Sequence, residues 1–235
     1  MRYKAVFFDA GETLLSPHPS FPELFRKVLR DEGFDVDPAA LRERLPALAD
    51  RFRQAAGEGV LWSTSMDLSK RWWSSIYQEL IEGLGLPFTP DLAGTLYRTF
   101  TDEANYRLFP DVEPTLERLR RAGLMLGVIS NFEEWLERLL ESLQVTRFFD
   151  VRVISGVEGM EKPDPHLFLL AMERGGVGPE HSAYVGDSPY FDVEPAVAVG
   201  MFGILLDRRG RHQDHQGPRI ASLEELPALL GADGS

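Results

Sequence analysis

Apolar and polar positions follow two different periodicities along this chain of 235 residues, one typical of strands and one typical of helices. A short apolar run at residues 5–8 leads to Asp9 and to a turn that contains Gly11, which predicts a buried strand with a carboxylate at its end. After Leu15 the apolar positions recur at helical spacing for about ninety residues. From about Tyr106 onward, apolar runs of strand length alternate with helical segments.

The helical part predicts four helices that form a small bundle. Their expected starts are the capping box Ser20–Glu23 and then Asp37, Ser65 and Thr89. Pro46 lies inside the second helix and should kink or split it. Trp72 falls on an apolar face and is expected in the bundle core, whereas Trp62, on a glycine-flanked break, is a candidate aromatic wall over a substrate.

The alternating part predicts repeated strand–helix units. Strands are expected at residues 124–129, 150–154, 182–185 and 201–206, and helices at residues 113–121, 133–143, 165–174, 193–199 and 223–230. Such repeats form a parallel sheet with helices on both faces, and the strand at residues 5–8 should join it. We therefore expect an α/β core domain, made of residues 1–15 and 106–235, and a helical domain inserted at residues 16–105.

The composition is that of a globular protein, with 43% hydrophobic and 26% charged residues. The absence of cysteine excludes disulfides and cysteine-based metal sites or nucleophiles. The net charge of −12 argues against nucleic acid or an anionic membrane as a partner, and an anionic substrate would need a local cation. No membrane span or signal peptide is recognisable, so we expect a cytoplasmic protein.

The polar run at residues 207–215 should be a solvated loop, with a basic ligand patch as the alternative.

Side chains able to do chemistry follow the strands of the expected sheet, and the carboxyl ends of parallel strands meet at one edge. They are Asp9, Ser130 and Asn131, Lys162, and Asp187 with Asp192. Clustered carboxylates raise each other's pKa, and a hard divalent cation such as Mg²⁺ relieves the repulsion. Lys162 and Ser130 suit the oxygens of a phosphoryl group, and a free oxygen of Asp9 can attack phosphorus.

This series resembles the four motifs of the haloacid dehalogenase superfamily, in order and over essentially the whole chain. The matching residues are Asp9 to Thr13, Ser130, Lys162-Pro163-Asp164, and Gly186-Asp187 with Asp192. The inserted helices resemble the helical cap of that family. Within it the chain is most similar to the haloacid dehalogenase-like hydrolase domain-containing proteins, and the core is then expected to be Rossmann-like.

The resemblance implies a magnesium-dependent phosphatase that acts on a small phosphorylated metabolite through an aspartyl-phosphate intermediate. Asp9 would be the nucleophile, assisted by Lys162. The groups expected to hold Mg²⁺ are Asp9, the Gly11 carbonyl and Asp187. The residues expected to bind the phosphate are Ser130, Asn131 and Lys162. The supporting residues are Thr13, Gly186 and Asp192, the last acting on the metal or on Lys162.

One position departs from the family pattern. Phosphatases of this family carry a second aspartate two residues after the nucleophile, as general acid and base, and this chain has Gly11 there. Glu12 should point to the other side of an extended segment. We therefore predict weak turnover of ordinary phosphate esters unless Glu12, His18 or a cap residue supplies the proton.

Two other interpretations stay open. A 2-haloacid dehalogenase of this family also uses an aspartate nucleophile without that acid, but it dispenses with metal, and the intact Gly186-Asp187 pair favours metal and phosphate. A non-catalytic protein that binds a phosphate ligand would not need a free nucleophile. In the phosphatase interpretation the cap closes over the site about hinges near residues 16–17 and 105–106.

Overall fold

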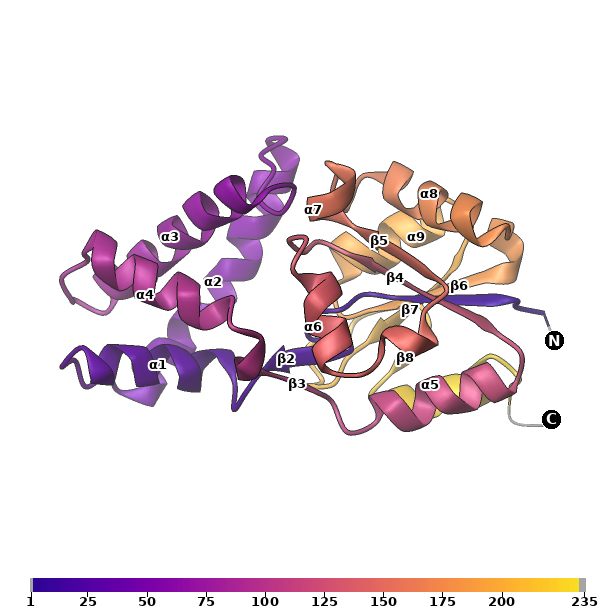
Figure 1. Cartoon of the computed structure of the whole chain (residues 1–235), viewed down its shortest axis with the longest axis horizontal. Coiled ribbons are helices and arrows are strands. Elements are labelled where there is room, and N and C mark those ends of the chain that lie inside the picture. Colours follow the sequence, from indigo (N-terminus) through magenta and orange to yellow (C-terminus); the bar gives the residue numbers. More distant parts are fainter. Residues whose placement is uncertain (1, 233–235) are drawn as a thin grey trace.

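The computed structural model describes residues 2–232, which form two units joined by a narrow ribbon (Figure 1). One is an α/β unit built on a six-stranded sheet. The other contains the four helices between residues 21 and 100, and we call it the helical unit. Among the described residues, no helix has both the length and the apolar character needed to cross a membrane.

Six parallel strands form the sheet. They are β1 (Ala5–Phe8), β4 (Met125–Ser130), β5 (Val151–Ile154), β6 (Ser182–Gly186), β7 (Phe202–Leu206) and β8 (Arg219–Ile220). Their order is β5-β4-β1-β6-β7-β8, so the first strand of the chain lies inside the sheet. The predicted parallel sheet is confirmed, although the short strand β8 was not predicted.

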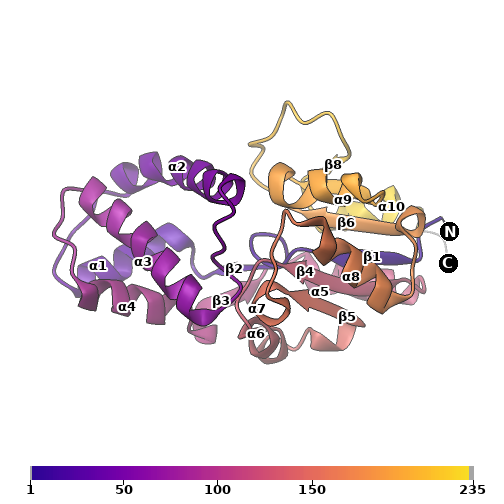
Figure 2. The ribbon, with the colours of Figure 1, turned by 90° about the horizontal axis from the view of Figure 1, so that it is seen from above.

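The apolar run of β1 is explained by burial on both faces. Val6 and Phe8 belong to the core cluster on one face of the sheet, and Ala5 and Phe7 belong to the cluster on the other. A parallel strand covered on both faces needs such a continuous apolar run. The carboxyl end of β1 points toward the helical unit in both views, which places Asp9 at the boundary between the units (Figure 1, Figure 2).

Helices cover both faces of the sheet. They are α5 (Val112–Arg121), α6 (Leu136–Ser142), α7 (Ser155–Glu158), α8 (Pro165–Gly175), α9 (Glu194–Ala198) and α10 (Leu226–Leu229). Helices α8 and α9 lie on the side opposite α5 (Figure 1). The helix predicted at residues 133–143 begins only at Leu136, and α7 was not predicted.

Two predicted helices are interrupted near prolines. The helix expected at residues 193–199 is a five-residue π-helical turn, η4 (Pro189–Val193), followed by α9. The helix expected at residues 223–230 is a single turn, η5 (Leu223–Glu225), followed by α10. Pro195 and Pro227 lie in the first turns of α9 and α10, where their missing N–H groups are tolerated.

The helical unit contains the four predicted helices. They are α1 (Phe21–Asp31), α2 (Pro38–Gly57), α3 (Met66–Gly83) and α4 (Pro90–Phe100). The four residues before them cap the helices, because each side-chain oxygen accepts a hydrogen bond from a backbone N–H of the first turn; they are Ser20, Asp37, Ser65 and Thr89. Pro46 lies inside α2 and does not split it, although its missing N–H removes one helical hydrogen bond.

A two-stranded antiparallel ribbon connects the two units. Its strands are β2 (Leu15–Pro17) and β3 (Tyr106–Leu108), and Pro17 pairs with Tyr106 where the chain enters and leaves the helical unit. Neither strand was predicted, because three residues are too few for a hydrophobic pattern. The ribbon lies where the sequence suggested two separate hinges. The predicted domain boundaries at residue 1 and residue 235 lie outside the described residues.

Candidate active site

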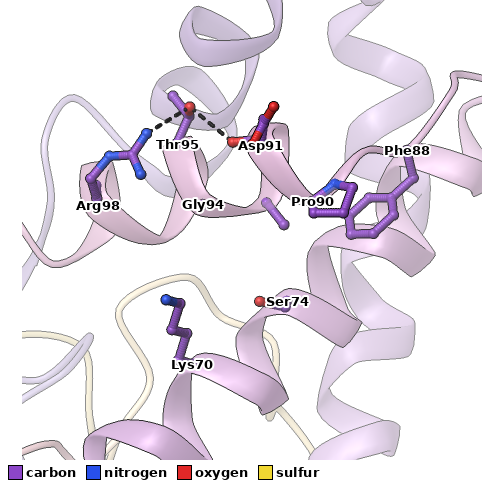
Figure 3. A pocket seen from close by; sticks show the side chains of 9 residues that line it. Lys70, Ser74, Phe88, Pro90, Asp91, Gly94, Thr95 and Arg98 are labelled. Atoms are coloured by element: carbon purple, nitrogen blue, oxygen red, sulfur yellow. Dashed lines mark hydrogen bonds between the residues drawn. The ribbon is translucent and has the colours of Figure 1, made fainter.

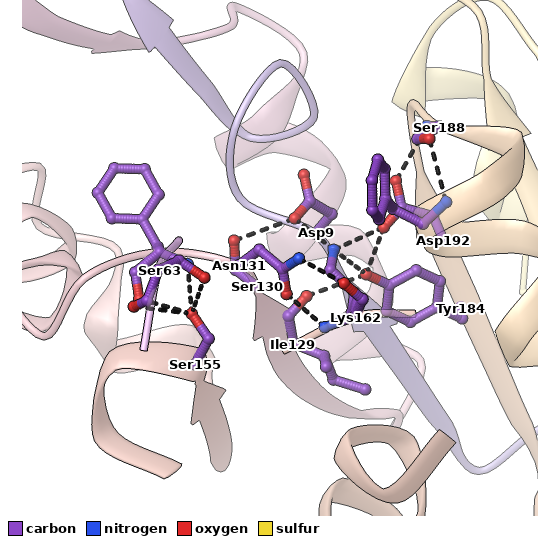
Figure 4. A network of polar contacts seen from close by, with 12 residues as sticks. Asp9, Ser63, Ile129, Ser130, Asn131, Ser155, Lys162, Tyr184, Ser188 and Asp192 are labelled. Carbon is purple, nitrogen blue, oxygen red and sulfur yellow. Dashed lines mark hydrogen bonds and ion pairs between the residues drawn. The ribbon is translucent and has the colours of Figure 1, made fainter. Parts of the chain in front are cut away.

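Asp9 lies directly after β1 and is 7% exposed. Its backbone N–H donates to the carbonyl of Val185 at 2.9 Å, which extends the pairing of β1 with β6 by one residue. The Ser130 hydroxyl and the Lys162 ammonium both donate to the Oδ1 atom of Asp9, at 3.0 and 2.8 Å (Figure 4). The ends of β1 and β4 and the loop after α7 therefore bring three side chains together at one carboxylate oxygen.

Lys162 is almost completely buried, at 2% exposure. Besides Asp9, its Nζ atom donates to Asp192 Oδ1 at 2.6 Å and to the Tyr184 hydroxyl at 3.0 Å. Burial alone would lower the pKa of Lys162, but Asp192 and Asp9 outweigh it and raise that pKa. The ammonium therefore stays charged, and its three N–H donors all have acceptors in this state.

Tyr184 is a site residue that the sequence did not reveal. Its hydroxyl lies 2.9 Å from the carbonyl of Ile129 and 3.0 Å from Asp192 Oδ1, in addition to accepting from Lys162. The side chain is fully buried, and this burial raises its pKa well above the ordinary value. Its only signal in the sequence is its place in the strand that ends at Gly186.

Asn131 contacts the backbone of Lys162 rather than the carboxylate cluster. Its Oδ1 atom accepts from the Lys162 N–H at 2.6 Å, and its Nδ2 atom donates to the Lys162 carbonyl at 2.8 Å (Figure 4). Both ends of the amide are therefore engaged with the protein. This arrangement fixes the loop that carries Lys162, and the expected contact between Asn131 and a phosphate stays a prediction.

Three carboxylates gather around the single ammonium. Oxygen atoms of Asp9, Asp187 and Asp192 all lie within 4.8 Å of one another. Burial, followed by the charges of Asp192 and Asp9, raises the pKa of Asp187 well above its ordinary value. Burial also raises the pKa of Asp9, against the opposing effect of Lys162. A cluster of carboxylate oxygens, with Asp9 and Asp192 buried and Asp187 half-buried, offers the donor set that a hard divalent cation such as Mg²⁺ requires.

Both carboxylate oxygens of Asp192 form hydrogen bonds, and one of them binds the Lys162 ammonium. Its Oδ1 atom receives the ammonium and lies near Tyr184, and its Oδ2 atom accepts the Ser188 N–H at 2.9 Å. A Cβ atom on Gly186 would collide with the Asp192 carboxylate, which explains the glycine at this strand end. Of the two supporting roles expected for Asp192, the structure favours the one toward Lys162.

The turn after Asp9 leaves the expected acid position open. No atom outside the neighbouring residues lies within 4 Å of where a Cβ on Gly11 would be. Glu12 has a left-handed φ of 55°, and its carboxylate accepts from Arg209 at 2.7 Å. His18 is exposed beside the ribbon. The hydroxyl of Thr13 is buried without a hydrogen-bond partner among the described residues.

The polar run at residues 207–215 forms the predicted solvated loop, most of it exposed, and its first residues are anchored beside this turn. Arg208 forms a bidentate pair with Asp111, at 2.7 and 2.9 Å, and also donates to the Thr13 carbonyl at 2.9 Å. A cavity of about 10 Å³ lies between the loop, Glu12 and Asp187. The basic residues of the run thus face acidic partners at the edge of the site.

The helical unit contacts the α/β unit close to Lys162. The Trp62 ring meets Phe191 edge-on, with ring centroids 5.6 Å apart, and Trp62 is only 5% exposed. The backbone of Trp62 and Ser63 also contacts the carboxylate of Glu161. Trp72 packs against the core of the helical unit, as predicted.

A larger groove, of about 580 Å³, lies between α3 and α4 (Figure 3). Its lining residues all belong to the helical unit or to its loop before α4; they are Lys70, Ser74, Phe88, Pro90, Asp91, Ala93, Gly94, Thr95 and Arg98. None of the predicted site residues lines it. The chemistry therefore gathers at the strand ends and not at this larger opening.

Comparison with known proteins agrees with this geometry. The fold and the site together define a hydrolase that presents a carboxylate at the end of an inner strand of a parallel sheet. The haloacid dehalogenase-like hydrolase family matches residues 3–200, and the chain belongs to this family.

Relatives and solved structures match along nearly the whole chain. The chain is 31% identical to haloacid dehalogenase-like hydrolase domain-containing protein 3 of Danio rerio, covering 96% of this chain and 95% of that one. It is also 31% identical to a phosphoserine phosphatase of Thermus thermophilus, covering 95% and 97%. A phosphatase structure of this family from Thermococcus onnurineus is 27% identical, with a TM-score of 0.63 over 99% and 100% of the two chains. These matches confirm the family, the subgroup and the α/β fold that the motifs predicted.

Proposed function

We propose that this protein is a magnesium-dependent phosphatase that acts on a small phosphorylated metabolite through a phosphorylated Asp9. The supporting observation is the asymmetry of the Asp9 carboxylate. Both side-chain hydrogen bonds that the described residues give it arrive at Oδ1, from Ser130 and Lys162. The Oδ2 atom is then the oxygen available to attack phosphorus.

The remaining roles follow from charge. Lys162 and Ser130 would turn part of their hydrogen bonding from Asp9 to the phosphoryl oxygens as the substrate enters. Asp9, Asp187 and the Gly11 carbonyl would hold Mg²⁺, whose charge would offset that of the phosphoryl group. Water would then cleave the aspartyl phosphate. Because Gly11 supplies no acid, leaving groups that need no proton should react fastest.

The helical unit would act as a cap over the strand ends, with the β2–β3 ribbon as its hinge. Trp62 and Phe191 meet where a cap would touch the core, and closure there would exclude bulk water from Asp9. The phosphatase relative supports a small phosphorylated substrate, since it is similar along nearly the whole chain. In this proposal the core comprises residues 1–15 and 106–235, and the cap comprises residues 16–105.

The test is a screen of p-nitrophenyl phosphate and a panel of phosphorylated metabolites with Mg²⁺, with and without a chelator. We expect hydrolysis that the chelator abolishes and that Asp9→Asn lowers by at least about a thousandfold. Trapping Asp9 with beryllium fluoride would separate an enzyme from a protein that only binds phosphate. Activity that survives both the chelator and Asp9→Asn would contradict the proposal.

A metal-independent 2-haloacid dehalogenase is the second candidate, because the position two residues after Asp9 is glycine. The same screen separates the two, since a dehalogenase would release halide from a 2-haloacid in the presence of the chelator. The three clustered carboxylates favour the phosphatase, because without a cation they face only one ammonium.

A further inference from the structure

Two buried carboxylates of the α/β unit receive hydrogen bonds from the helical unit. Glu161, 5% exposed, lies in the loop after α7 and accepts from the cap segment between α2 and α3. Glu133, 6% exposed, lies before α6 and accepts from the hydroxyls of Ser69 and Tyr97. Neither glutamate belongs to the motifs that identified the family. A buried carboxylate without donors would be costly, so each one favours the contact between the units.

Glu161 is the more tightly bound of the two. Its Oε2 atom accepts from the Ser63 N–H at 2.8 Å and from the Ser63 hydroxyl at 2.5 Å, and the Trp62 N–H is shared between Oε1 at 3.2 Å and Oε2 at 3.3 Å. The Ser155 hydroxyl donates to Ser63 Oγ at 2.7 Å and so extends the contact into the α/β unit (Figure 4). The Glu161 carboxylate thus accepts from three donors on two consecutive residues of the helical unit.

The contact between Glu161 and the helical unit matters because Glu161 directly precedes Lys162 in the chain. The next residue is Lys162, whose ammonium holds Asp9 and Asp192. The backbone of Lys162 is fixed from the opposite side by both ends of the Asn131 amide. The two-residue segment is therefore held between the cap, through the Glu161 side chain, and the end of β4, through the Lys162 backbone.

We propose that Glu161 is a positioning residue that couples docking of the cap to the placement of Lys162. This inference rests on the proposed function, in which the helical unit is a mobile cap and Lys162 stabilises the phosphoryl group. When the cap lifts, Glu161 loses all three donors and must turn to water. Its backbone is then restrained only from within the α/β unit, by the Asn131 amide on Lys162 and by the Asp164 N–H on the Glu161 carbonyl. The three hydrogen bonds of the ammonium then have to hold Lys162 without support from the cap, so its placement for catalysis is firmest while the cap is docked.

The test compares Glu161→Ala with Glu161→Gln and with Glu133→Gln. Glu161→Ala removes the acceptor, whereas Glu161→Gln keeps an oxygen able to occupy the Oε2 position and accept from both Ser63 groups. Glu133→Gln alters the other contact between the units, at a residue not bonded to Lys162. The readouts are hydrogen exchange at the amides of Trp62, Ser63 and Lys162, and kcat and KM for p-nitrophenyl phosphate.

In Glu161→Ala we expect exchange to accelerate at least about tenfold at all three amides and kcat to fall about tenfold or more, with KM changed less. Glu161→Gln should keep most of the protection and most of kcat. Glu133→Gln should leave the Lys162 amide protected. Thermal unfolding of each variant verifies that the chain is folded, and Ser63→Ala, which removes one donor from the cap side, should reproduce part of the Glu161→Ala effect.

Two results would overturn the inference. In the first, the Lys162 amide stays protected in Glu161→Ala although those of Trp62 and Ser63 are released. In the second, Glu133→Gln and Glu161→Ala lower kcat equally, which would mean that cap anchoring in general is responsible. If the unmodified protein hydrolyses no phosphate ester, the proposed function fails, and the exchange experiment still decides whether Glu161 couples the cap to Lys162.

Discussion

At the scale of single residues, the site has buried groups that can neutralise charge but no acid at the position where this family usually carries one. Lys162, Asp192 and Tyr184 form a closed hydrogen-bonded group, and the carboxylates of Asp192 and Asp9 keep the buried ammonium charged. Nothing comparable stands at Gly11, and Glu12 is paired with Arg209. In the proposed function the chain would thus stabilise a phosphoryl group without an acid at the usual place for the leaving group.

The first prediction concerns Gly11→Asp. The position is open to a side chain, and its φ lies outside the left-handed region, so an aspartate fits without strain. We expect kcat for a phosphate ester with a poor leaving group to rise by about tenfold to a hundredfold, because general acid help is worth ~10²–10⁴-fold when well placed. Gly11→Asn is the matched control, with the same shape and no acid. Equal rates in the two variants would show that proton transfer is not what the site lacks.

The second prediction concerns Tyr184→Phe, which keeps the ring and removes the hydroxyl. Lys162 then loses one of its three acceptors, and the Ile129 carbonyl loses a neighbour at 2.9 Å. We expect a loss of about 1–3 kcal/mol in the free energy of unfolding and a fall in kcat of about tenfold. Urea unfolding and initial rates measure the two effects. The control is Tyr190→Phe, whose ring packs on Phe191, and it should change neither quantity appreciably. An unchanged kcat in Tyr184→Phe would assign the hydroxyl to stability alone.

At the scale of elements, the sequence predicted those features that depend on local pattern. The run at β1, the alternating strand–helix units and the capped starts of the four helices in the helical unit all follow from spacing and residue type. The ribbon of β2 and β3 was missed because its pairing joins residues about ninety positions apart. Tyr184, Glu133 and Glu161 were missed for a related reason, since a tyrosine in a strand or a glutamate in a loop gains its role only from a distant partner.

Asp111 shows how one side chain joins several elements. It lies just before α5 and accepts from Arg208 of the loop after β7, and from Ser222 and Leu223 at η5. Burial alone would raise the pKa of Asp111, but Arg208 and the Leu223 N–H lower it below its ordinary value. The carboxylate is therefore ionised at neutral pH and holds the loop that carries Arg209.

The third prediction follows from the sign of this shift. A folded-state pKa below the unfolded value of about 3.9 contributes stability above that pH, and the contribution is lost as pH falls through the folded value. Asp111→Asn should cost about 3 kcal/mol of unfolding free energy at pH 7, because it leaves Arg208 without its partner. The difference from the unmodified protein should shrink below about pH 4. Urea unfolding over this pH range measures it.

The control for Asp111 is Asp150→Asn. Asp150 also pairs with an arginine, Arg120, but both side chains are about 40% exposed. Its removal should cost less than about 1 kcal/mol, because water and salt screen an exposed pair. A difference between Asp111→Asn and the unmodified protein that stays constant from pH 7 to pH 3 would contradict the proposed ionisation.

At the scale of the whole molecule, the arrangement of the two units follows from how the chain crosses between them. Both crossings run through the ribbon, so the helical unit is attached at one end of the sheet, where β1 delivers Asp9 (Figure 2). The order of units was predictable, since a helical block interrupts an α/β pattern after its first strand. Their contact surface was not, because it depends on which side chains of two separately folded cores face one another.

The last prediction concerns the field of the whole chain on an anionic substrate. The molecule carries 37 acidic and 25 basic residues, so a phosphate ester approaches against a net charge of −12. Lys162 and the bound cation would attract it at short range within the closed site, whereas Arg208 and Arg209 at the edge of the site are paired with Asp111 and Glu12. Raising the ionic strength from about 0.01 to about 0.1 M shortens the screening length from about 30 to about 10 Å, which removes the long-range repulsion and leaves the local attraction.

At saturating Mg²⁺ we therefore expect kcat/KM to rise several-fold over this range while kcat changes little, and the rise should be the same in sodium chloride and potassium chloride. A fall in kcat/KM would mean that the approach to Asp9 is dominated by the arginines of the 207–215 loop and not by the net charge of the protein.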